Sequence, residues 1–387
     1  MPRKAAKGNG HIRQRSDGRW EGKYTVGRDP GTGKQIQKSV YGKTQAEVRI
    51  KLRDITHSID TGEYMEPAKM TVGEWLDVWF GEYANNLKEH TRATYETQIR
   101  CHIKPALGAV KLSVLKPHQI QKFYNKLLAD GLKPKTIKNI NGVFHRALDQ
   151  AVMLQYIAKN PCFGVKLPRI EDPEMHPLTE DEMHRFFEAI KGNPYEMIFK
   201  VDVFSGMRQA EIMGLTWDRV DFEAGTILID RQLIHEKKKG GAYKFAPLKN
   251  DKPRKITPAA SVMRLLKEQK RIQAQNKLLA GSMWDDGGFP GLVFTNPLGG
   301  HYVHNTLTHN VTRLACVAGI ESFCFHDLRH TYAVNALRAG DDVKTVQYNL
   351  GHATAAFTLD KYAHYTEDMR QDSAKRMDDF MSRFPGL

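Results

Sequence analysis

The sequence predicts a multidomain, mainly α-helical protein with small β elements. Three observations support this fold class. The chain has 387 residues, which is too long for one ordinary domain. Apolar and polar residues alternate between turn residues in only two stretches, before residue 42 and between residues 226 and 257. Elsewhere, apolar residues recur mostly at helical spacing.

The first segment, residues 1–67, is predicted to be a three-stranded sheet followed by a helix. The strands are expected at 11–15, 19–26 and 35–41, with turns at 16–18 and 29–33. Thr44 is the expected N-cap of a helix whose apolar positions include Ala46, Val48, Ile50, Leu52 and Ile55. Basic residues follow the strands: Arg13, Arg15, Arg19, Lys23, Lys34 and Lys38. Such a ribbon fits a DNA major groove, although a solvated basic surface would look the same.

The second segment, residues 70–167, is predicted to be a small helical domain. Helices are expected from Thr71, and over 91–103, 117–130 and 135–154. Pro105 is expected to end the second helix and Gly131 the third. Basic side chains on the polar side of the fourth helix can contact phosphates or solvent alone: Lys133, Lys135, Lys138 and Arg146.

The third segment, residues 177–387, is predicted to be mostly helical and to follow a polar, proline-broken linker at 170–174. It also holds a strand-rich insert, with strands expected at 226–229, 242–248 and 254–257. Residues 366–387 are expected to form a last helix with one apolar stripe, made of Met377, Phe380, Met381 and Phe384.

Charge and composition favour a nucleic-acid partner in the cytoplasm. The net charge is +14, and residues 1–53 hold 14 Lys and Arg against 4 Asp and Glu. No signal peptide or membrane-spanning segment is visible. The four cysteines are widely spaced without a zinc pattern, so buried, reduced thiols and no metal are expected.

The third segment also contains residues suited to cleaving a phosphodiester without a metal. That reaction needs a nucleophile, cationic donors for the non-bridging oxygens, an acid and a base. Arg208 follows a glycine and is expected at a helix start, with Glu211 orienting it from the same face. His326 and Arg329 are expected to share a helix face, with His330 turned away.

Two more candidates follow. His352 comes after a glycine turn and is suited to donate to a phosphate oxygen. Tyr362 is the candidate nucleophile; since a tyrosine has a free pKa of about 10, nearby arginines would have to ease its ionisation. Taken singly, each of these residues is more often structural than catalytic.

Together, the order Arg208, Lys249, His326, Arg329, His352 and Tyr362 resembles the tyrosine recombinases. The surrounding sequences match too: SGMRQAEIMGL, HDLRHTYA and LGHATAAFTLDKYAHY. Lys249 lies in PLKNDKPRKITP, where the family places a lysine on a β-hairpin turn. The first segment resembles the arm-type DNA-binding domain of phage and conjugative-transposon integrases, the second their core-binding domain, and the third their catalytic domain.

The resemblance implies a site-specific recombinase that needs no cofactor and works as a tetramer on double-stranded DNA. An excision or DNA-bending accessory protein is a further possible partner. Lys252 competes with Lys249, and Tyr365 with Tyr362, for their roles. The C-terminal stripe either packs on its own domain or, as in the family, docks on a neighbouring protomer. A type IB topoisomerase and a catalytically silent DNA-binding protein are the alternative functions.

Overall fold

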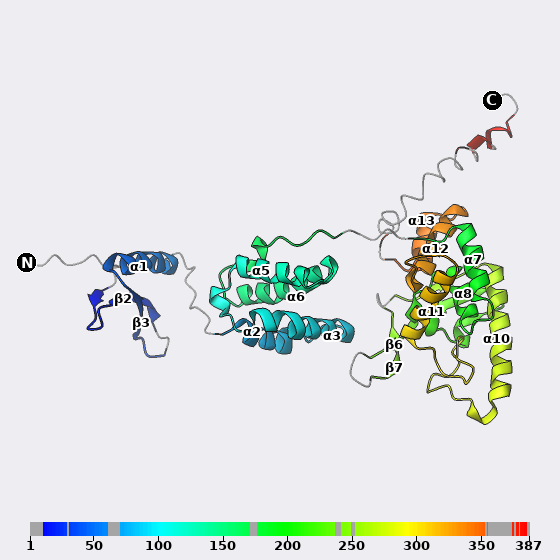
Figure 1. Cartoon of the computed structure of the whole chain (residues 1–387), viewed down its shortest axis with the longest axis horizontal. Helices are drawn as coiled ribbons and strands as arrows, with labels where there is room; N and C mark the ends of the chain where they lie inside the picture. Colours follow the sequence, from blue (N-terminus) through cyan, green and yellow to red (C-terminus); the bar gives the residue numbers. More distant parts are fainter. Residues whose placement is uncertain are drawn as a thin grey trace, which may run out of the picture. The chain divides into compact units, whose positions relative to one another are not determined.

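The computed structural model of the chain describes residues 11–28, 31–60, 70–170, 176–236, 241–248, 252–352, 354, 374, 377, 378 and 380–384. The chain divides into two compact units, Met1–Glu171 and Asp172–Leu387 (Figure 1). In the described residues, no helix is both long and apolar enough to cross a membrane.

The first unit begins with the predicted three-stranded sheet and helix. The antiparallel strands β1 (Ile12–Gln14), β2 (Trp20–Arg28) and β3 (Gln35–Gly42) lie in sequence order, and helix α1 (Gln45–Asp60) packs on one face. Gly22 allows the close approach, because a Cβ there would lie 2.6 Å from Val48. Thr44 caps α1 as predicted, accepting from the Glu47 amide. Ile50, expected among the apolar positions, is exposed.

A helical bundle follows in the same unit. Its elements are α2 (Val72–Val78), α3 (Glu89–Gln98), α4 (Lys104–Leu107), α5 (Pro117–Ala129) and α6 (Pro134–Met153). The predicted cap is confirmed: Thr71 and Glu74 form a capping box at the start of α2. The predicted apolar face of α6 is also confirmed, since it is buried throughout. The Trp75 indole donates to the carbonyl of Ala147, which ties α2 to α6.

The prediction that Pro105 ends the second helix is wrong. A π-helical turn, Ile99–Ile103, follows α3, and the chain continues into α4 with the proline in its first turn. The π-helical turn shifts the backbone hydrogen-bond pattern just before the proline, so the helix continues past its missing N–H. The expectation of buried cysteines is also wrong for three of the four, since only Cys162 is buried. The three exposed residues lie on a helix face, in the last turn of a helix and at an N-cap: Cys101, Cys316 and Cys324.

The second unit packs helices around a large apolar core and a second, smaller apolar cluster (Figure 1). Its helices are α7 (Glu180–Ile190), α8 (Glu196–Val203), α9 (Gln209–Met213), α10 (Ala260–Ala280), α11 (His304–Val317), α12 (Phe325–Arg338) and α13 (Val343–Leu350). The predicted insert forms two small antiparallel sheets, with orders β4-β5-β8 and β6-β7. Their strands are β4 (Val220–Asp221), β5 (Thr226–Ile229), β6 (Arg231–His235), β7 (Tyr243–Pro247) and β8 (Arg254–Ile256).

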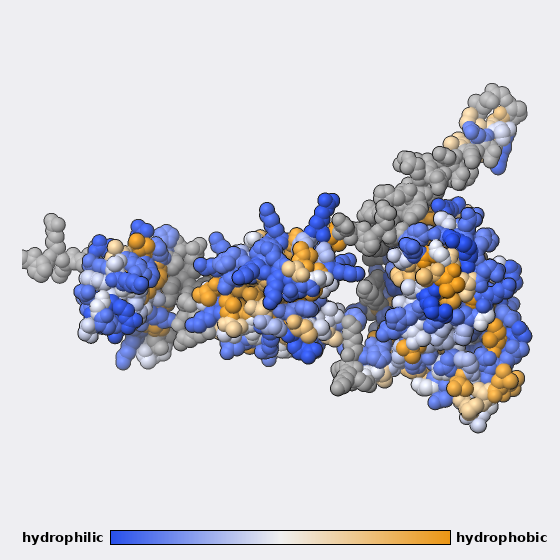
Figure 2. Space-filling view, viewed as in Figure 1, coloured by the Kyte–Doolittle hydropathy of each residue, from blue (hydrophilic) through white to orange (hydrophobic). Residues whose placement is uncertain are grey.

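The face that Figure 2 shows is mostly hydrophilic over the described residues. An apolar area covers the end of α10, where Leu278, Leu279 and Met283 are exposed. The four apolar side chains of the C-terminal stripe are exposed as well: Met377, Phe380, Met381 and Phe384.

Candidate active site

A sharp turn after α8 presents Arg208 at the start of α9. The backbone N–H groups of Ser205 and Gly206 both donate to the carbonyl of Asp202. Gly206 has φ +62°, and a Cβ there would lie 2.3 Å from the Tyr332 ring. Only glycine fits this position, both for its backbone conformation and for its closeness to α12. The turn therefore fixes where the following arginine stands.

Arg208 is the N-cap of α9, and Glu211 holds it, as predicted. The Arg208 guanidinium donates to Glu211 Oε1 at 2.8 Å, and the Arg208 amide donates to Oε2 at 3.0 Å. Glu211 also accepts two hydrogen bonds from Arg254. Burial alone would raise the pKa of Glu211, but Arg254 and Arg208 more than reverse this and hold it at about 2. The carboxylate is thus fully ionised near neutral pH.

Helix α12 supplies Arg329 and His326. Arg329 is only 2% exposed. It donates to the carbonyl of Gly206 at 2.7 Å and to that of Leu350 at 2.5 Å. It therefore joins the turn before Arg208 to the end of α13. His326 is exposed, at the first turn of α12.

The expectation that His330 is turned away from His326 is wrong. The two rings make an edge-to-face contact with centroids 4.7 Å apart. Residues four apart lie one above the other on a helix, so both rings share a face. His330 is therefore a neighbour of the candidate acid or base.

His352 follows the left-handed C-cap of α13. Gly351 has φ +63°, and a Cβ there would lie 3.0 Å from the Arg254 guanidinium. Burial first, and then the positive charges of Arg329 and Arg208, together lower the pKa of His352 to about 3. His352 is therefore neutral at physiological pH, with one ring N–H to donate.

Three arginines meet at the C-terminal end of α13. The carbonyl of Asn349 accepts from Arg254, that of Leu350 from Arg329 and that of Gly351 from Arg208. The carbonyls at a helix C-terminus carry partial negative charge, which suits guanidinium donors. Strand β8 and helices α9 and α12, which carry these three arginines, therefore converge on the segment that leads to His352.

Sequence reasoning missed two buried residues here. Arg254 was not among the predicted site residues, although its guanidinium binds Glu211. Asp202 is fully buried, and among the described residues its carboxylate oxygens accept no hydrogen bond. Burial raises the pKa of Asp202 well above its usual value, against the opposing charge of Arg329. The available signal was an aspartate within the largely apolar run at 197–204, three residues before the turn.

Several predicted site residues lie outside the described residues: Lys249, Tyr362 and its competitor Tyr365. Lys252, the competitor of Lys249, is described and exposed. Of the predicted site, the structure therefore brings together Arg208, Glu211, Arg329 and His352, with His326 near enough to act on the charge of His352. Among the described residues, no group of three or more His, Cys, Asp or Glu side chains is arranged to hold a metal ion.

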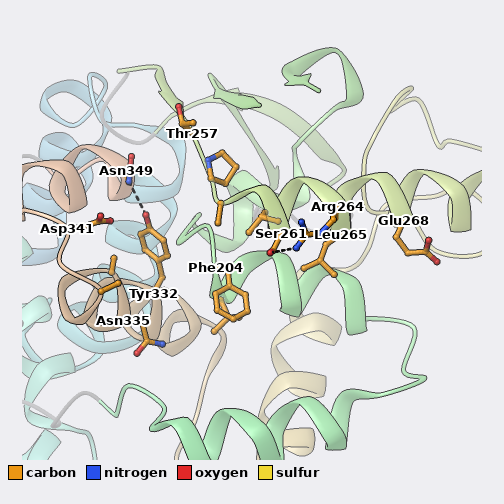
Figure 3. Close-up of a pocket in the computed structure, with 16 residues that line it drawn as sticks. Phe204, Thr257, Ser261, Arg264, Leu265, Glu268, Tyr332, Asn335, Asp341 and Asn349 are labelled. Carbon is orange, nitrogen blue, oxygen red and sulfur yellow. Dashed lines mark hydrogen bonds between the residues drawn. The ribbon is translucent and has the colours of Figure 1, made fainter. Parts of the chain in front are cut away.

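A groove of about 980 Å³ adjoins the turn before Arg208 (Figure 3). It is lined mainly by apolar side chains from the end of α8, the start of α10, α12 and α13. Phe204 belongs to the turn before Arg208, and Tyr332 packs on Gly206 and accepts from the Asn349 amide at 3.0 Å. The groove and the site thus share residues of the same turn and helix.

The predicted DNA-binding residues of the N-terminal sheet lie on different surfaces of that sheet and its turns. On β1 and β2, Arg13 and Lys23 are on the face opposite α1; Arg13 binds Glu21 at 2.7 Å and Lys23 is exposed. Lys38 pairs with Tyr24 on the face that α1 covers, and Lys34 lies in the loop before β3. Arg19 and Arg15 pair with Asp17 in the first turn.

The basic residues of the helical bundle lie together at one helix start. Lys133, Lys135 and Lys138 are exposed at and after the N-cap of α6. Arg146, further along α6, is also exposed and donates to the Tyr95 hydroxyl at 2.8 Å. These side chains are accessible to a phosphate backbone.

The chain matches known protein families over most of its length. The model of the phage integrase family matches residues 176–369, and that of the phage integrase N-terminal SAM-like domain matches residues 71–128. The tyrosine recombinase XerC-like protein of Caldanaerobacter subterraneus subsp. tengcongensis is 31% identical over 92% of this chain and 94% of its own. The ICEBs1 integrase of Bacillus subtilis is 20% identical over 96% of this chain and 100% of its own.

Solved structures share the fold. The Tn1549 transposon integrase in complex with a circular intermediate DNA aligns with a TM-score of 0.68 and 21% identity, covering 80% of this chain and 100% of that one. A lambda integrase tetramer bound to a Holliday junction aligns with a TM-score of 0.56 and 19% identity, covering 92% and 96%.

Proposed function

The chain belongs to the phage integrase family of tyrosine recombinases, enzymes that cleave and rejoin DNA, and from this premise we propose that it integrates and excises a mobile DNA element. The observation that carries the proposal is the convergence of Arg208, Arg329 and His352, which α9, α12 and α13 bring to one point. Two guanidiniums and a neutral imidazole at one point suit a phosphate whose negative charge grows during reaction.

In the proposed reaction, the Tyr362 oxygen attacks the scissile phosphorus. The bond between phosphorus and the 5′-oxygen breaks, and a 3′-phosphotyrosyl bond forms. Arg208 and Arg329 bind the non-bridging oxygens, and His352 adds one hydrogen bond. His326 accepts the tyrosine proton, while Lys249 gives a proton to the departing 5′-oxygen. The 5′-hydroxyl of a second strand then reverses the steps, so the DNA is rejoined without an external energy source.

Two of these assignments have competitors within the chain. Lys249 is preferred to Lys252 because its offset to Arg254 and Ile256 follows the family pattern. Tyr362 is preferred to Tyr365 because a histidine stands two residues after it, as in the family. Variants at each pair of positions separate the alternatives.

We assign DNA binding to two modules ahead of the catalytic one. Residues 1–67 form the proposed arm-binding domain, residues 70–167 the core-binding domain and residues 177–387 the catalytic domain. The open face of the first sheet carries Lys23, and the start of α6 presents three lysines to a phosphate backbone. Because its proposed substrate is the DNA of a mobile element, we propose that the enzyme works in the bacterial cytoplasm.

We further propose that the protein acts as a tetramer on DNA, in which the C-terminal stripe of one copy fills the groove of the next. The stripe offers exposed Met and Phe side chains, and the Phe380 and Phe384 rings pack on each other 5.2 Å apart. The groove in Figure 3 is large and mainly apolar, so it can bury such side chains. An excision or DNA-bending accessory protein is part of the same proposal.

A two-plasmid assay tests the proposed function against its alternatives. Supercoiled plasmids carrying the paired attachment sites of the element are incubated with the protein, and exchange and relaxation are measured. The proposal predicts recombinant plasmids. Relaxation without exchange supports a type IB topoisomerase, and tight binding with neither product supports a catalytically silent DNA-binding protein.

A further inference from the structure

Arg254 is a buried arginine, and each of its three guanidinium nitrogens donates one hydrogen bond inside the protein. Its side chain is 4% exposed. Nη1 and Nη2 donate to the two oxygens of Glu211 at 3.1 and 2.6 Å, and Nε donates to the carbonyl of Asn349 at 2.8 Å. The side chain is thus held on three sides by the protein itself.

Glu211 is shared between Arg254 and Arg208. Each guanidinium binds the same carboxylate, which is almost fully buried. A buried carboxylate needs a compensating charge, so if Arg254 were absent, Arg208 would be the nearest cation to supply it. Two cations and one anion leave one net positive charge, whereas Arg208 and Glu211 alone would cancel. Arg254 therefore leaves the charge of Arg208 available to a phosphate.

Arg254, at the start of strand β8, also holds the C-terminal end of α13 in place. Its bond to the Asn349 carbonyl lies next to the bonds of Leu350 and Gly351 with the other two arginines. Gly351 packs against the Arg254 guanidinium, where a Cβ would lie 3.0 Å away. The position of the segment that carries His352 thus depends on this side chain.

We propose that Arg254 is a positioning residue for strand cleavage, which holds Glu211 and the end of α13 so that Arg208 keeps its charge directed at the scissile phosphate. This inference rests on the proposed function, in which Arg208 binds that phosphate. Lysine at position 254 would keep the charge but not the three fixed donors.

The test compares two nicked duplexes that differ only at the scissile position. One carries the natural phosphodiester and the other a methylphosphonate, which has no negative charge there. The full-length protein is assayed for strand cleavage as wild type, Arg254→Lys and Arg208→Lys. Arg219→Lys is the matched control, because Arg219 pairs with Asp218 and Asp230 and, among the described residues, with none of the proposed site residues.

We expect Arg254→Lys to lower cleavage of the phosphodiester at least about tenfold more than cleavage of the methylphosphonate, as Arg208→Lys does. Arg219→Lys should change neither rate. A selective loss in Arg208→Lys with none in Arg254→Lys overturns the inference and leaves the proposed function intact. No selective loss in Arg208→Lys overturns both, because the phosphate then does not depend on that arginine.

A second pair of variants covers the case in which Arg254→Lys does not fold. Arg254→Gln leaves Glu211 to Arg208 alone, whereas Glu211→Gln with Arg254→Gln removes both buried charges. We expect the double variant to cleave the phosphodiester faster than Arg254→Gln does, since nothing then opposes the charge of Arg208. Equal or slower cleavage by the double variant contradicts the inference.

Discussion

The site strongly controls the protonation of His352. Burial, together with the positive charges of Arg329 and Arg208, lowers its pKa from 6.5 to about 3. The unfolded chain binds a proton below pH 6.5 that the folded chain refuses. The stability that this group contributes is therefore complete above pH 6.5 and is lost as the pH falls toward 3.

The first prediction follows from that sign. His352→Gln should lose less unfolding free energy than wild type between about pH 7.5 and about pH 5, because glutamine does not titrate. Denaturant unfolding at the two pH values measures the difference. His184→Gln, at an exposed position on α7, is the control. An unchanged pH dependence in His352→Gln would show that His352 is not held neutral by its surroundings.

At the residue scale, the sequence predicted contacts between residues a few positions apart better than contacts between residues far apart along the chain. The spacing of Arg208 and Glu211 predicted their pairing, which the structure confirms. Arg254 stands 43 residues from Glu211 and 95 from Asn349, so nothing local indicated its role. The relation of His326 to His330 was misjudged because a four-residue spacing returns to the same helix face.

At the element scale, the turn between α8 and α9 sets the position of Arg208. Gly206→Ala places a Cβ against Tyr332 at a positive φ, whereas Gly192→Ala has a positive φ with open space around it. Gly192→Ala should cost only the backbone strain, about 1–2 kcal/mol. Gly206→Ala should cost more and should also slow strand cleavage. Thermal unfolding and a cleavage assay on both variants test this; equal costs would mean that the closeness to Tyr332 is unimportant.

The open face of the first sheet carries a separate prediction. Lys23→Gln should weaken binding to arm-site DNA, because one phosphate contact is lost. The slope of the logarithm of the binding constant against the logarithm of the salt concentration should become shallower by about 1. Lys51→Gln is the matched control, since Lys51 lies on α1 and pairs with Glu47. Binding titrations at several salt concentrations measure both. The sheet does not read DNA through this face if the two variants behave alike.

Local signals predicted these elements well where a cap or a turn marked the boundary. Thr44 and Thr71 both cap helices as expected. Pro105 misled because a π-helical turn before it shifts the hydrogen-bond pattern, and no sequence rule marks such a turn. Strand β6 was missed because it lies between two predicted strands and forms its hairpin with β7.

At the scale of the whole molecule, the proposed assembly depends on the C-terminal stripe. Replacing Phe380 and Phe384 with alanine should leave the melting temperature of the free protein nearly unchanged, because both side chains are exposed. It should reduce tetramer formation on DNA, since the apolar contact between copies is lost. Ser382→Ala, on the same segment, is the control. A large loss of stability in the free protein would instead mean that the stripe packs on its own domain.

The central claim is that Tyr362 cuts DNA by becoming joined to it. Wild type, Tyr362→Phe and Tyr365→Phe are mixed with nicked duplexes from the ends of the element, with a chelator present, and run on a denaturing gel. The account predicts a protein–DNA adduct in wild type and Tyr365→Phe and none in Tyr362→Phe. An adduct that survives in Tyr362→Phe, or its absence from wild type despite tight binding, would contradict it.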